Sequence, residues 1–140
     1  MNQILWARLH GGATHFPIAA LTLSVLFDHA GLWWRDELRR REFRAFGFYS
    51  LLIAAVASPV AVISGIGLSK GILLGTGMLA LHHYCIWPAF GLLIGLAVWR
   101  LVMRERASRR ARGFYLALAS VTLIAMMSAG YCGGEMLIGR

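Results

Sequence analysis

The sequence predicts an all-α integral membrane protein, a four-helix bundle with both termini on the outer side of the membrane. Hydrophobic residues make up 59% of the 140 residues and charged residues only 14%, whereas about 25% of a soluble domain is charged. The mean hydropathy is high, at +0.65. The apolar residues form four runs, each close to the roughly 20 residues that a helix needs to span the hydrocarbon core.

These runs define a single transmembrane domain over residues 1–140. The expected helices cover about residues 14–34, 45–68, 78–100 and 113–134. Residues 2–9 are expected to form a short interfacial segment, which a break at Gly11-Gly12 separates from the first helix. Pro59 and Pro88 fall inside the second and third helices, where the missing backbone donor favours a kink.

Basic residues are concentrated in two of the three connections. Residues 35–44 and 100–112 hold 11 of the 14 lysines and arginines. In an up-and-down bundle these two connections share one side, and the positive-inside rule assigns that side to the cytoplasm. We therefore expect a multi-pass protein of the bacterial inner membrane with both termini in the periplasm. The net charge of +8 fits attraction to anionic lipid, and no nucleic-acid partner is expected.

Histidines near the outer side are the main candidates for a cofactor site. His10 and His15 open the first apolar run, and His82 and His83 open the third. Imidazoles within a membrane are functional candidates, and a bundle builds cofactor sites from facing helices. The pattern predicts one b-type haem with His15 and either His82 or His83 as iron ligands, and with His10 or Arg8 near the propionates.

A second haem on the inner side is not expected. His15 and His29 are 14 residues apart on one helix face, a spacing similar to that of two-haem four-helix cytochromes b. The counterpart on the third helix would fall near Leu96 or Ala97, which cannot bind iron. Covalent attachment is excluded because the chain has no Cys-x-x-Cys-His.

Two other interpretations of the outer side stay open. Cys85, Cys132 and Glu135 lie near it, and a mixed set of histidine, cysteine and carboxylate suits copper or zinc. A disulfide between the two cysteines is also compatible with an oxidising compartment. Alternatively, the histidines only form hydrogen bonds between helices, and the protein is a structural or accessory subunit.

Asp28 lies near the inner end of the first helix, beside His29. The arginine-rich flank favours an ion pair over a proton relay, with Arg35 or Arg39 as the expected partner. No motif for nucleophilic catalysis or phosphate binding occurs, so we assign no catalytic residue and expect no catalysis by this chain alone.

A family resemblance supports the same fold. The start His10-x4-His15-Phe-Pro-Ile-Ala, a histidine opening the third helix, and Gly133-Gly-Glu-Met-Leu near the end resemble a family of small four-helix bacterial membrane proteins of unknown function. The resemblance covers nearly the whole chain and implies the fold, and it points to His10, His15 and the third-helix histidine. The layout is similar to that of small membrane cytochromes b.

Together these patterns predict an electron-transfer or anchoring subunit. Gly91 and Gly95 form a small-xxx-small pair that allows another helix to approach closely. The expected partners are membrane lipid and subunits of a respiratory or other redox complex, with quinone as a candidate electron donor.

Overall fold

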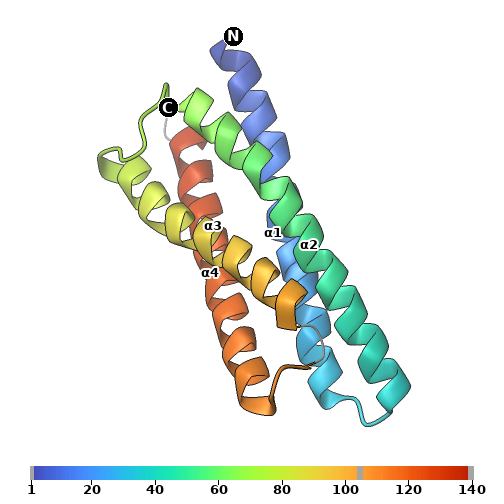
Figure 1. Ribbon diagram of the computed structural model, residues 1–140. Helices are drawn as coiled ribbons and strands as arrows, with labels where there is room; N and C mark the ends of the chain where they lie inside the picture. The colour runs from blue at the N-terminus through green and yellow to red at the C-terminus, as the bar shows by residue number, and fades with distance from the viewer. Residues whose placement is uncertain (1, 104–105, 139–140) are drawn as a thin grey trace.

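The computed structural model describes residues 2–103 and 106–138 of the chain. Within these residues there are four helices and no strand: α1 (Gln3–Trp33), α2 (Glu37–Leu68), α3 (Gly77–Met103) and α4 (Arg109–Ile138). Figure 1 shows the start of α1, the end of α4 and the α2–α3 connection at one end of the bundle, which we call the terminal end. The α1–α2 turn and the start of α4 lie at the opposite end, called the arginine end. The up-and-down arrangement predicted from the sequence is confirmed.

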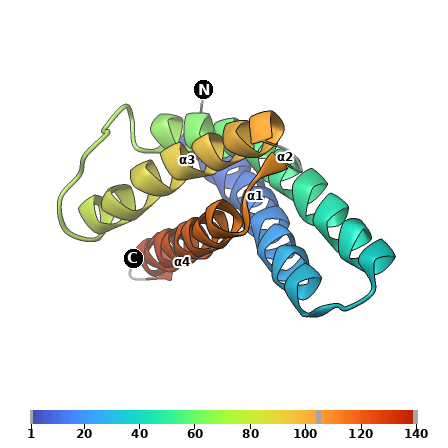
Figure 2. The same ribbon diagram turned by 60° about the horizontal axis from the view of Figure 1, so that its bottom comes forward.

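The bundle consists of two helix hairpins. α1 packs mainly against α2 and α3 against α4, while α1–α4 and α2–α3 contacts join the two hairpins. Figure 2 shows that the hairpins diverge from each other. Leu21, Leu51 and Leu93 are fully buried where they meet. All four helices are long and apolar enough to cross a membrane, so this is a multi-pass membrane protein whose outer helix faces contact lipid.

α1 is longer than predicted and runs without interruption through Gly11-Gly12. Asn2 caps its start, with the side-chain oxygen accepting a hydrogen bond from the backbone N–H of Ile4 at 3.1 Å. The first turns pack closely on α2, because a Cβ added at Gly67 would overlap the Trp6 ring. This packing keeps residues 3–13 helical, so the predicted break and the separate interfacial segment are wrong.

The other helices also extend beyond the apolar runs. α2 begins at Glu37 and not near residue 45, because the Asp36 carboxylate accepts hydrogen bonds from the N–H groups of Leu38 and Arg39, both at 3.3 Å. Glu37 forms ion pairs with Arg40 at 3.0 Å and Arg41 at 3.3 Å on the same helix. Polar side chains that cap or pair within a helix thus prolong it past the hydrocarbon core. α2 and α3 each continue through their internal prolines.

Lys70 adopts a left-handed backbone conformation after the end of α2, with φ of 56°. The N–H of Gly71 closes this turn by bonding the carbonyl of Ile66 at 2.9 Å. Because a Cβ is strained in this region, Lys70→Gly is expected to raise the free energy of unfolding by about 0.5–1 kcal/mol. Reversible denaturant titration in mixed micelles would measure it. Gly71→Ala, at φ of 84°, is the matched opposite and should lower stability. A Lys70→Gly protein less stable than wild type would contradict the prediction.

Candidate functional site

Three histidines gather at the terminal end, and we call His10, His82 and His83 the histidine cluster. The ring centroids of His10 on α1 and His82 on α3 are 6.5 Å apart, with ring planes inclined by 76°. The centroids of His82 and His83 are 5.6 Å apart. This contact between His10 and His82 connects the two hairpins at the terminal end.

Backbone carbonyls fix the orientation of His10 and His82. His10 Nδ1 lies 2.9 Å from the carbonyl oxygen of Ala61 and 3.3 Å from Ser64 Oγ, and His82 Nδ1 lies 2.8 Å from the carbonyl oxygen of Ala129. Since a carbonyl oxygen can only accept, each Nδ1 carries the proton and donates it. The Nε2 atom of each neutral ring is therefore left with its lone pair, as a metal ligand requires.

His83 is buried differently from its neighbours. Its side chain is 6% exposed, and its Nδ1 atom has no hydrogen-bond partner among the described residues. The ring stacks on Trp87, with centroids 6.0 Å apart, and Trp87 Nε1 donates to the carbonyl of Leu73 at 2.8 Å. His83 thus packs on a tryptophan that is bonded to the α2–α3 connection, and no protein group that the structure describes fixes its own Nδ1.

His15, the α1 residue expected to face α3, lies on an exposed part of the helix. Its Nδ1 atom bonds the carbonyl of Gly11 in its own helix at 2.6 Å, and no ring contact involving it occurs among the described residues. The structure instead brings His10 to His82. The sequence feature that permits this position of His10 is Gly65 on α2. A Cβ at that position would press on the His10 ring. Arg8, two residues before His10, is exposed.

The cysteines and the glutamate of the predicted copper or zinc alternative differ in exposure. Cys85 is half-buried, Cys132 is buried, and both are free thiols, while Glu135 is exposed. Within the described residues, no group of three or more histidine, cysteine, aspartate or glutamate side chains is arranged so that it could hold a metal ion.

A second polar centre lies at the arginine end, formed by Asp28, Arg100 and Tyr115, which we call the ionic network. Arg100 Nη1 forms an ion pair with the Asp28 carboxylate and donates to the Tyr115 hydroxyl at 2.9 Å. The hydroxyl donates to Asp28 at 3.0 Å. Arg100 Nη2 donates to the backbone carbonyl of Arg44 at 2.7 Å. The network therefore joins all four described helices through one guanidinium group.

The predicted ion pair of Asp28 is confirmed, but its expected partners Arg35 and Arg39 are wrong. Asp28 is 6% exposed and faces into the bundle, whereas both arginines are exposed beyond the end of α1. The partner is Arg100, the basic residue in the last turn of α3. His29 bonds its own helix at the carbonyl of Val25, at 2.8 Å, near this end of α1.

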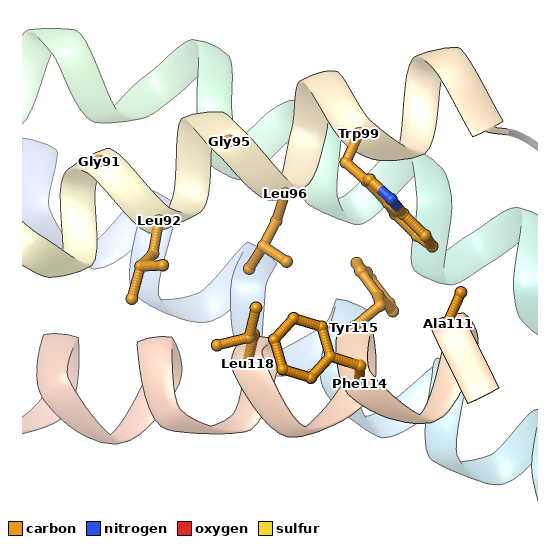
Figure 3. A pocket seen from close by; sticks show the side chains of 9 residues that line it. All are labelled: Gly91, Leu92, Gly95, Leu96, Trp99, Ala111, Phe114, Tyr115 and Leu118. Carbon is orange, nitrogen blue, oxygen red and sulfur yellow. The ribbon is translucent and has the colours of Figure 1, made fainter. Parts of the chain in front are cut away.

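A groove between α3 and α4 leads toward the ionic network. Its volume is about 290 Å³, and its lining is apolar. Figure 3 shows Leu92 and Leu96 of α3 and Phe114 and Leu118 of α4 pointing into the space between the helices. Trp99 and Tyr115 stack across it, with ring centroids 5.2 Å apart. A Cβ added at Gly91 or Gly95 would meet no atom within 4 Å, so the small-xxx-small pair packs on no other described helix.

The fold and the two polar centres define a small multi-pass membrane protein with ionisable side chains buried at both ends. Residues 7–139 match the family described as Predicted membrane protein (DUF2231), a family of unknown function. The chain belongs to this family, as the resemblance of its sequence suggested. No curated protein and no solved structure matches the chain significantly.

Proposed function

We propose that this protein binds one b-type haem at the terminal end, with His10 and His82 as axial ligands, and serves as an electron-transfer or anchoring subunit. The observation that carries the proposal is the neighbouring pair of imidazoles, one from each hairpin, each with Nδ1 bonded to a backbone carbonyl. Their Nε2 atoms are the ligand atoms of choice for iron.

The separation of the two rings suits axial ligation. Two imidazoles on opposite sides of one metal ion, with metal–nitrogen bonds of about 2 Å, have ring centres roughly 6 Å apart. The His10 and His82 centroids are 6.5 Å apart. Their interplanar angle of 76° is compatible with this arrangement, because two perpendicular rings can both contain the iron–nitrogen axis.

The surroundings of the pair support a ligand role. Metal-binding histidines usually donate their other N–H to a carbonyl or carboxylate, which fixes the ring. Added Cβ atoms at Gly11, Gly12 and Gly134 would meet nothing within 4 Å, whereas Gly65 of α2 packs directly on the His10 ring. Arg8 is exposed and could bind a propionate. The haem iron would supply one-electron chemistry, with a potential set by its ligands and their hydrogen bonds.

The charge distribution supports an orientation for this site. With the arginine end in the cytoplasm, the histidine cluster and both termini would lie on the periplasmic side of a bacterial inner membrane. A haem at that depth could exchange electrons with quinol in the outer leaflet or with a periplasmic redox partner. The subunit would then extend the electron path of a larger respiratory or other redox complex.

Visible spectra of oxidised and reduced protein, purified in mild detergent from cells grown with added haem, test the proposal. Wild type is expected to show a Soret band and sharp reduced α and β bands. The Soret band and the α and β bands are expected to be lost in His10→Ala and His82→Ala. Free imidazole should restore them in part, because it can occupy the space of the missing side chain and bind iron. The bands should persist in the control variants His15→Ala, His29→Ala and His83→Ala.

Two outcomes would overturn parts of this proposal. Bands that survive in His10→Ala and vanish in His15→Ala would move the α1 ligand to His15. A colourless, folded wild type would exclude haem and favour an accessory subunit. The same hydrogen bonds support that second role, because His10 joins α1 to α2 and His82 joins α3 to α4. Alanine at either position would then lower stability without any change of spectrum.

A further inference from the structure

A second pocket, of about 590 Å³, lies between α3 and α4 near the terminal end. Four of its seven lining residues carry sulfur: Met78 and Cys85 from α3, and Met127 and Cys132 from α4. The whole chain has two cysteines and six methionines, so both cysteines and a third of the methionines line this one pocket. Sulfur is therefore concentrated here in a way that apolar packing alone does not require.

Helix geometry places the two sulfur residues of α3 together and brings α4 beside them. Met78 and Cys85 are seven residues apart, which is about two turns, so they share one face of α3. α4 runs antiparallel beside this face, and the bond from His82 to the carbonyl of Ala129 fixes the register of the two helices. Met127 and Cys132 lie on either side of that carbonyl along α4.

The thiols and thioethers lie at different depths. Cys132 is 5% exposed and Cys85 is half-buried, and both are free thiols. Met78 and Met127 also line the pocket and are more exposed, at 41% and 57%.

We propose that this pocket binds one Cu(I) ion through the thiolates of Cys85 and Cys132, with Met78 and Met127 as thioether donors. Thiolates and thioethers are soft ligands that select Cu(I), whereas zinc is held by thiolate, imidazole and carboxylate ligands. Binding deprotonates both thiols, so two protons leave for each ion bound, and copper stays in the +1 state. None of its four sulfur ligands belongs to the histidine cluster, so the copper and haem proposals use different ligands.

The test is an anaerobic titration of the reduced, detergent-purified protein with Cu(I), in competition with the chelator bicinchoninate. Wild type is expected to bind one equivalent. Cys85→Ser and Cys132→Ser should each weaken binding at least tenfold, and Met78→Leu and Met127→Leu several-fold, since leucine keeps the volume but removes the donor. Met103→Leu is the matched control, because Met103 is exposed near the arginine end of α3, outside the pocket, and should bind like wild type.

His10→Ala separates this proposal from the haem proposal, because His10 bonds α2 and not the two helices that line the pocket. This variant is expected to remove the haem bands and to leave the Cu(I) stoichiometry unchanged. Either proposal can therefore fail without the other. Failure of the wild type to take Cu(I) from the chelator, with both thiols shown to be reduced, would overturn the copper proposal. Full binding by the double variant Cys85→Ser/Cys132→Ser, or equal binding of zinc by wild type, would overturn it as well.

Discussion

Replacing Arg100 with leucine is expected to lower the free energy of unfolding by about 3–5 kcal/mol, because the substitution leaves a buried carboxylate without its counter-charge. Asp28 is 6% exposed and lies between helices that are apolar enough to cross a membrane, so little water can reach it. The Tyr115 hydroxyl would still donate to Asp28 at 3.0 Å, but a neutral donor does not neutralise the charge. Arg100→Leu also removes the bond to the α2 backbone.

A double variant separates the loss of the pair from the cost of an unpaired charge. Asp28→Asn/Arg100→Leu leaves no charge in the network, so it is expected to recover at least half of the stability that Arg100→Leu loses. Denaturant titration in mixed micelles would compare the variants. Arg35→Leu is the control, because Arg35 is exposed, and a change within about 0.5 kcal/mol is expected. A double variant no more stable than Arg100→Leu would show that the ion pair is not the source of the loss.

Gly47→Ala is expected to destabilise the protein by about 1–3 kcal/mol through overpacking against the ionic network. A Cβ at position 47 of α2 would overlap the Asp28 carboxylate, which Arg100 and Tyr115 hold in place. The carboxylate cannot move aside without breaking these bonds. At an open helical position, alanine in place of glycine would instead stabilise by about 0.5–1 kcal/mol.

Gly91→Ala is the matched control, because Gly91 is an open helical position in the same protein. Its Cβ would meet no atom within 4 Å, so the variant should be at least as stable as wild type. Thermal unfolding in detergent, followed by circular dichroism, would rank the two variants. The loss caused by Gly47→Ala should also shrink in an Asp28→Ala background, where the overlapping carboxylate is gone. Equal losses in both backgrounds would show that the clash is not with Asp28.

The number of helices and their up-and-down order could be predicted because both depend on local properties of the chain. The length of each apolar run and the sign of the charges between runs can be read without knowing which faces meet. The helix ends were less accurate, since α1 and α2 begin early where Asn2 and Asp36 cap them. A cap of this kind extends a helix through polar residues. A prediction from hydropathy assigns such polar residues to a loop.

The pairing of side chains could be predicted only in part. The outer histidines were identified from their composition and position, but the residue that meets His82 is His10, because α1 continues through the glycines and packs on Gly65 and Gly67. Asp28 was expected to form an ion pair, yet its partner is 72 residues away. Such a contact depends on how the second hairpin docks on the first, which no pattern within one helix encodes.

The ionic network also has a consequence for the order in which the protein is made. Asp28 enters the bilayer with the first hairpin, whereas Arg100 and Tyr115 arrive only with the second. A charged residue within a membrane helix opposes insertion by the translocon, with a cost that reaches about 2.5–3.5 kcal/mol at the helix centre. The nascent first hairpin therefore carries a polarity penalty that the Arg100 guanidinium removes only after α3 has been synthesised and inserted. An incomplete chain therefore differs chemically from a finished one by this unpaired acidic group.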